Sequence, residues 1–203
     1  MKMPRAKMTM LILLLAGCQE KKLKVEQPPA DEVEFIAPMG KKIAGNLVST
    51  LKGEVKAAME SGGVEKAIST CQVKALPLTD SVAKNSSFHV SIKRISDKVR
   101  NPRNMPDQQE RLALDLFDQI IRSGEELPEF YIQKITGGST IEYNFYKPMR
   151  MESMCLICHG DKYTMSPAAA KMLAKYYPED QARDYKEGDF RGLIRIKFYE
   201  PSL

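Results

Sequence analysis

The run Cys155-Leu156-Ile157-Cys158-His159 constrains this chain more than any other feature. Because positions i, i+3 and i+4 of a helical turn share one face, the two thiols and the imidazole point the same way. Two thiols at this spacing reach the two vinyl groups of one porphyrin, and the adjacent histidine then lies under its iron. The run therefore predicts one covalent c-type haem, with Cys155, Cys158 and His159 as binding residues and His159 as a metal ligand.

Two other kinds of site are compatible with the same run. A zinc site needs four ligands, commonly in two paired clusters, and here only Cys71 could complete a Cys3His set. A thioredoxin-like redox pair normally follows a strand in a βαβ unit, which the surrounding pattern does not predict. A structural zinc protein therefore stays an alternative. A haem-dependent peroxidase or oxidoreductase is another, with His89 as its one candidate acid-base group, but we expect a carrier or sensor rather than an enzyme.

Residues 1–17 predict a lipoprotein signal peptide rather than a fold element. Three cations precede a short apolar run, Met8–Ala16, which is too short to cross a bilayer as a helix. Small residues then lead to Cys18, in a pattern that resembles the bacterial lipobox, so Cys18 is the predicted site of lipid attachment. We expect a protein on the periplasmic side of a bacterial membrane, held by its lipid alone. Gln19 makes the outer membrane one option.

Charge and length bound the rest of the chain. The formal charge is +5 over 203 residues, but residues 1–17 hold three cations and no anion, which leaves +2. Such a balanced surface gives no electrostatic basis for nucleic-acid binding. Residues 18–40 include Pro28-Pro29 and many charges, and predict a flexible lipid-anchored tether. Residues 41–203 are then expected to form a single haem-binding domain.

The hydrophobic pattern changes along this domain from helical to alternating. Helices are expected over 41–61, from Val64 to a stop or kink at Pro77, over 106–121 and over 167–177, with a break at Gly62-Gly63. Strands are expected over 88–92, 130–135, 141–145 and 194–198. Because helices lead and an antiparallel sheet follows, the fold class is α+β.

The second axial position of the iron is either empty or filled by one of three kinds of candidate ligand. His89 is the one other histidine, but it is out of phase with the apolar residues of its strand and is expected to face solvent. Cys71 is an odd thiol in an exported protein and shares a helix face with three apolar residues, so it should point inward. A buried thiolate needs a cation, which ferric iron would supply. The nearby methionines are better explained as packing residues: Met149, Met151, Met154, Met165 and Met172.

Short runs in a fixed order resemble a family of single-haem, PAS-like proteins that includes periplasmic sensing modules. The resemblance covers about residues 43–198, and its carriers are Ala67–Ala75, Arg94-Ile95-Ser96, Arg100-Asn101-Pro102 with Asn104, Glu110, Tyr146-Lys147-Pro148, Cys155–Gly160 and Gly188–Gly192. It implies a PAS-like antiparallel sheet with N-terminal and flanking helices, and Cys71 as the distal cofactor and metal ligand. It also implies Arg94, Arg100 and Arg103 as partners of the haem propionates, with a solvated basic turn as the alternative.

The expected function is periplasmic electron transfer, or redox and small-ligand sensing, through one His/Cys-ligated haem. Because thiolate ligation donates electron density, we expect a low-potential, six-coordinate, low-spin haem. The expected partners are a redox or signalling protein, with CO or NO as candidate small ligands and membrane contact only through the N-terminal lipid.

Overall fold

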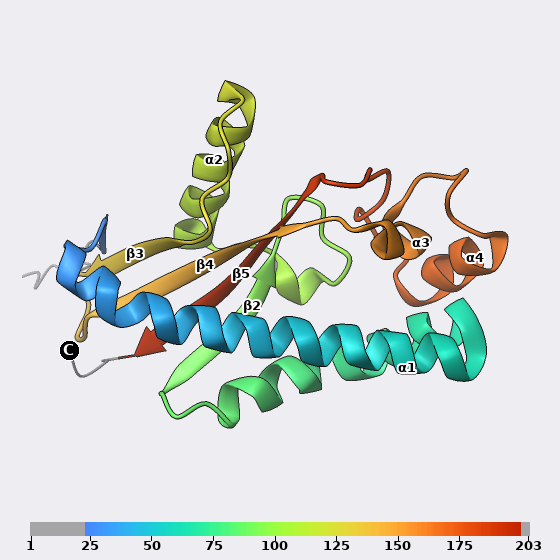
Figure 1. The fold of residues 1–203 in the computed structure, drawn as a ribbon, viewed down its shortest axis with the longest axis horizontal. Coiled ribbons are helices and arrows are strands. Elements are labelled where there is room, and N and C mark those ends of the chain that lie inside the picture. Colours follow the sequence, from blue (N-terminus) through green and yellow to red (C-terminus); the bar gives the residue numbers. More distant parts are fainter. Residues whose placement is uncertain (1–22, 200–203) are drawn as a thin grey trace, which may run out of the picture.

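The computed structural model describes residues 23–199, so the predicted signal peptide and Cys18 lie outside the described residues. One five-stranded antiparallel sheet forms its centre, in the order β1-β3-β4-β5-β2 (Figure 1). The strands are β1 (Lys24–Glu26), β2 (Val90–Ile95), β3 (Tyr131–Thr136), β4 (Glu142–Arg150) and β5 (Phe190–Tyr199). The helices are α1 (Ala30–Lys84), α2 (Gln108–Ser123), α3 (Leu156–His159) and α4 (Pro167–Tyr176). The predicted α+β class is confirmed. Within residues 23–199, no helix is both long and apolar enough to span a bilayer.

The long helix α1 consists of two segments that lie side by side (Figure 1). The chain leaves helical geometry at Gly62 and Gly63, and Gly63 has φ +66°, a left-handed conformation that favours glycine. An ion pair between Lys74 and Glu54 joins the two segments across this break. The predicted break at Gly62-Gly63 is therefore confirmed, and it returns the second segment along the first.

The flexible tether predicted over residues 18–40 is wrong for residues 24–40. β1 pairs with β3, and α1 begins at Ala30, eleven residues before the expected start. Ile36 is fully buried and Ala37 nearly so, in the main core against the sheet. These apolar residues recur at helical spacing, and their burial outweighs the polar composition that suggested a tether.

The sequence predicts that the helix stops or kinks at Pro77, but the helix does not stop there. α1 continues through Pro77 to Lys84, and its non-helical residues are confined to the two glycines. A proline inside a helix removes one backbone hydrogen bond. Val82 and Ala83, beyond the proline, pack against the main core and hold the last turns in place.

The second face of the sheet is covered in part by α2, which is rotated from its predicted orientation. The sequence predicts one apolar face made of Leu112, Leu116, Phe117, Ile120 and Ile121. Phe117 is buried as predicted and Leu116 and Ile120 are half-buried, but Leu112 and Ile121 are exposed. Ala113 and Leu114 are buried beside Phe117, against residues of β4 and β5. The capping box of Asp107 and Glu110 begins the helix and fixes this rotation, because Glu110 is buried among charged partners from the sheet.

β4 and β5 are longer than predicted, and they extend from the core to one end of the molecule. At that end their register shifts between Met149 and Arg150, opposite Gly192. Gly192 has φ +133°, and a Cβ there would come within 2.1 Å of the Ile95 carbonyl oxygen. After β4 the chain passes directly into the turn that carries Cys155.

Candidate functional site

The Cys-x-x-Cys-His run forms one helical turn just beyond β4. Cys155 ends a 3-10 turn (Ser153–Cys155), and Cys158 and His159 lie in α3. All three side chains line one cavity, as their spacing predicts. The described cysteines, Cys71 included, are free thiols. A Cβ at Gly160 would lie 2.0 Å from Thr164 Oγ1 and 2.6 Å from the Leu156 carbonyl oxygen, so the turn leaves no space for a side chain at this position.

Three adjoining cavities surround this turn, with volumes of about 360, 150 and 200 Å³. Leu51, Arg100 and His159 line all three of them. Together they fall within the size range of cofactor and ligand pockets, roughly 300–1,000 Å³. The turn with the motif is therefore set beside a space large enough for a prosthetic group.

Cys71 lies on the second segment of α1 and lines one of the cavities around the motif. It lines the cavity of about 200 Å³ together with Cys155, Cys158 and His159. Burial raises the pKa of the Cys71 thiol, while the positive charges of Arg94 and Arg100 act to lower it. The net shift is upward, so these two cations alone do not make the thiol ionise. A metal cation would favour the thiolate.

His159 is held in the tautomer that a metal ligand needs. Its Nδ1 donates to the Ala182 carbonyl oxygen at 2.9 Å, which leaves Nε2 unprotonated with its lone pair free. Burial, followed by the charges of Arg100 and Arg191, lowers the pKa of His159 to about 3. The imidazole is therefore neutral. Arg100 Nη1 lies 3.4 Å from Nε2, a long contact that a metal at Nε2 would replace.

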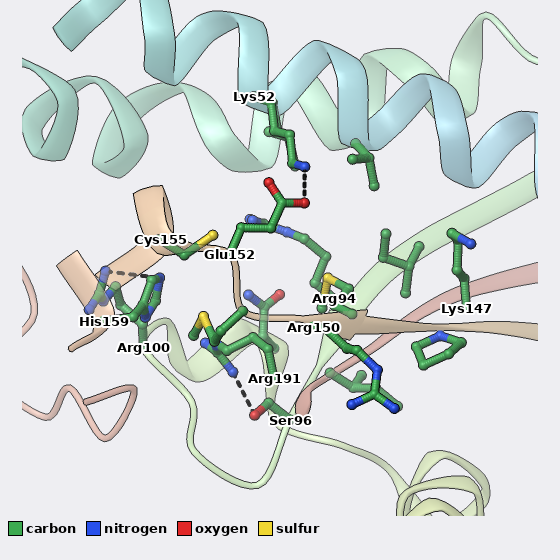
Figure 2. A pocket seen from close by; sticks show the side chains of 18 of the residues that line it. Lys52, Arg94, Ser96, Arg100, Lys147, Arg150, Glu152, Cys155, His159 and Arg191 are labelled. Atoms are coloured by element: carbon green, nitrogen blue, oxygen red, sulfur yellow. Dashed lines mark hydrogen bonds and ion pairs between the residues drawn. The ribbon is translucent and has the colours of Figure 1, made fainter. Parts of the chain in front are cut away.

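The cavity of about 360 Å³ is strongly basic (Figure 2). Among the described residues that line it, Glu152 is the one acid, and it is paired with Lys52. Arg94 from β2 and Arg191 from β5 both face this space, and Arg191 donates to Ser96 Oγ at 2.6 Å. Such a wall suits anionic groups, including carboxylates.

The three arginines expected to meet the propionates divide into two groups. Arg94 and Arg100 line the cavities. Arg103 is exposed in a 3-10 turn (Pro102–Asn104) and lines none of the three cavities around the motif, so the solvated-turn reading describes it better. Arg191 also lines the cavity of about 360 Å³, although the sequence did not indicate it as a partner of the propionates.

The fold removes only some of the other axial candidates from the motif, since Met149 and Met151 line the cavity of about 360 Å³ together with His159. His89 is exposed just before β2, and its ring centroid lies 4.8 Å from that of Tyr199, with the two rings tilted by 34°. It lines none of the three cavities around the motif. Met165 and Met172 pack in the cluster around Ile68. Met154 shares the cavity of Cys71 and His159 and so remains a candidate beside Cys71.

Sequence reasoning missed the residues that support the motif from behind. Ala182 and Tyr185, in the loop before β5, bond or pack against the motif turn. Asp180, in the same loop, bonds to Arg100, which donates to the Cys158 carbonyl oxygen. Tyr177, beyond α4, lines the same cavity as Cys71, and burial raises its pKa to about 12. These residues lie in irregular segments without hydrophobic periodicity, so no pattern in the sequence pointed to them.

The donor set suits a haem. Two thiols on one turn could bond to vinyl groups, a neutral imidazole presents Nε2, the Cys71 thiol lines the same cavity, and cations line the adjoining space. Within residues 23–199, no three His, Cys, Asp or Glu side chains already converge as a ready-made metal site.

Comparison with known proteins gives two matches. The family model described as "Tll0287-like" matches residues 19–198. Among solved structures, the cyanobacterial heme-protein Tll0287 is similar with a TM-score of 0.56 and 17% sequence identity, over 87% of this chain and 98% of that one. At this identity the structural match shows a shared fold. No curated protein sequence matches the chain.

Proposed function

Because this chain belongs to the Tll0287-like family, a family of haem proteins, we propose that it binds one haem c covalently. Cys155 and Cys158 form the thioether bonds, His159 is the proximal ligand, and Cys71 is the distal ligand. The observation that carries this proposal is the single cavity that these four side chains line. The PAS-like classification of the fold stays a prediction.

The bound haem would supply one-electron chemistry between ferric and ferrous iron. The chain's own residues set its conditions. As a ligand, Cys71 would donate electron density and so lower the reduction potential, and the Ala182 carbonyl accepts a hydrogen bond from His159 Nδ1–H. Arg94 and Arg191 compensate the propionate charges. With both ligands bound, the haem would be six-coordinate and low-spin, with a low reduction potential.

The role we propose is electron transfer or redox and ligand sensing on the periplasmic side of a membrane. Sensing is supported by the place of Cys71, on a segment of α1 that begins after a double-glycine break. An electron from a redox partner would reduce the ferric iron and weaken its bond to the Cys71 thiolate, and this segment would then lose one of its attachments to the motif turn. Rapid CO uptake by the reduced protein would favour sensing, and inertness to CO would favour electron transfer.

Export and lipid attachment at Cys18 rest on residues 1–18 alone. Cell fractionation of the native chain tests them: the protein should sediment with membranes and be accessible from the periplasm. Recovery in the cytoplasm would contradict both.

Replacement of Cys71 is the decisive experiment. The absorption and EPR spectra of the wild type, Cys71→Ala and Met154→Leu should be recorded in protein matured with the haem-attachment machinery. We expect Cys71→Ala to lose the low-spin thiolate signal and Met154→Leu to keep it. Met154 is a matched control because it lines the same cavity.

Three outcomes would contradict the proposal in different ways. Identical spectra for the wild type and Cys71→Ala would exclude Cys71 as a ligand. A colourless protein that contains zinc would favour the structural zinc alternative. Peroxidase turnover would favour the enzyme alternative, for which the exposed position of His89 offers no support.

A further inference from the structure

Asp180 is a buried carboxylate between two arginines. Its side chain has 0% exposure. It accepts hydrogen bonds from Arg100 Nε at 3.1 Å and Nη2 at 3.0 Å, from the Ala182 N–H at 2.9 Å and from Arg183 Nε at 3.2 Å. Burial acts to raise the pKa of Asp180, but the Arg100 bonds and charge outweigh it and hold the pKa below its usual value. The group is therefore an anion at neutral pH.

Two of the partners of Asp180, Arg100 and Ala182, also bond to the motif turn. Arg100 Nη2 donates to the Cys158 carbonyl oxygen at 2.5 Å and to the Ala182 carbonyl oxygen at 3.2 Å. The Ala182 carbonyl is also the acceptor for His159 Nδ1. Asp180 thus holds Ala182 by accepting a hydrogen bond from the Ala182 N–H. It also neutralises Arg100, which donates to the same Ala182 carbonyl oxygen as His159 Nδ1.

The loop after Asp180 is bonded to the same turn along its backbone. The Tyr185 N–H donates to the His159 carbonyl at 3.1 Å, and the Asp184 N–H donates to the Gly160 carbonyl at 3.1 Å. The position of the His159 ring therefore depends on the placement of a loop for which Asp180 is the buried anchor.

We propose that Asp180 is a positioning residue for the proximal histidine, acting through Arg100 and the Ala182 carbonyl to hold the His159 ring and keep the reduction potential low. This inference rests on the proposed haem ligation by His159. A strong Nδ1–H bond makes the imidazole a more electron-rich ligand, which favours ferric iron. A compensated Arg100 also avoids an unpaired positive charge close to the iron.

Loss of the Asp180 carboxylate changes the reduction potential through two contributions, which act in the same direction. Without the carboxylate, the full charge of Arg100 polarises the Ala182 carbonyl and weakens its bond from His159 Nδ1. The same charge stabilises ferrous iron, because reduction adds an electron. Both contributions raise the reduction potential of an Asp180→Asn variant.

The test compares holoproteins of the wild type, Asp180→Asn and Asp161→Asn. Asp161 is a matched control: it is two residues from His159 and loses the same charge, but its carboxylate bonds only within the 161–164 turn. We expect Asp180→Asn to shift the ferric–ferrous equilibrium at least tenfold toward ferrous iron, about 59 mV for a one-electron couple. Its EPR g-values should change with the ring orientation. Asp161→Asn should change the equilibrium less than threefold.

The outcomes separate this inference from the proposed function. A haem-loaded Asp180→Asn protein with the potential and EPR spectrum of Asp161→Asn overturns the inference and leaves the ligation intact. If Asp180→Asn takes up no haem, Asp180→Glu is measured in its place, because it keeps the charge but displaces the carboxylate. EPR g-values equal to those of the wild type would then overturn the inference. A wild type whose haem is not bound by His159 overturns the proposed function first.

Discussion

At the scale of single residues, buried charges on this protein are tied to particular partners. Asp180 anchors the loop behind the motif, and Glu110 does the equivalent for α2. Glu110 has 1% side-chain exposure and bonds to Lys93 Nζ at 2.7 Å and to Arg195 Nε at 2.9 Å. It also accepts from the Asp107 N–H in the capping box. One carboxylate therefore joins the start of α2 to β2 and β5.

Replacing Glu110 by alanine should destabilise the protein strongly. The change leaves Arg195 largely buried without its anion and removes the capping box. We expect a loss of about 3 kcal/mol in the free energy of unfolding, in line with broken buried ion pairs. Urea unfolding at pH 7 measures it. Asp115→Ala, at an exposed position of the same helix, should change stability by less than about 0.5 kcal/mol. Equal effects of the two changes would show that the buried cluster does not stabilise α2.

At the scale of elements, α1 shows how closely a helix and the sheet pack. A Cβ at Gly40 would lie 2.3 Å from Cγ of Phe145, which is fully buried in β4. A Cβ at Gly45, one turn and a half further along, would meet nothing within 4 Å. The same residue type thus has a packing role at one position and none at the other.

Alanine at these two glycines should change stability in opposite directions. Gly40→Ala overpacks the core and should cost about 1–3 kcal/mol. Gly45→Ala should stabilise by about 0.5–1 kcal/mol, because alanine restricts the unfolded chain and favours the helix. Thermal unfolding of both variants beside the wild type tests this. Stabilisation by both changes would mean that α1 does not approach β4 so closely at Gly40.

At the scale of the whole molecule, the cavity lies between segments far apart in the chain. Cys71 comes from the second segment of α1, and the motif from the turn after β4. The second segment of α1 is tied to this end of the molecule by the apolar cluster around Ile68 and Leu173. A bond from iron to Cys71 would add a cross-link between these parts.

Loss of that cross-link should loosen one part of the molecule and leave the sheet unchanged. In haem-loaded Cys71→Ala, we expect the amides of residues 64–84 to exchange with solvent at least tenfold faster than in the wild type. The amides of β4 and β5 should exchange at the same rate in both. In haem-free protein the substitution should have little effect. Equal protection of residues 64–84 in the two haem-loaded proteins would contradict a bond from Cys71 to iron.

Much of the site could be predicted from sequence where the signal is local. The spacing of Cys155, Cys158 and His159 places them on one helical turn, and the helical phase of Cys71 turns it inward. The break at Gly62-Gly63 and the α+β class follow from equally local patterns. These predictions need only backbone geometry over a few residues, which the chain determines without knowledge of its surroundings.

Other features depended on tertiary contacts. Residues 24–40 have a polar, proline-containing composition, and only burial of Ile36 against the sheet makes their order evident. The rotation of α2 depends on the ion pair between Glu110 and Arg195. The link from Asp180 through Ala182 to His159 depends on a loop without hydrophobic periodicity. The sequence by itself determined the candidate residues for holding a haem and their local geometry. The tertiary structure decided which distant side chains surround them, because burial and charge pairing act between segments whose separation along the chain carries no pattern.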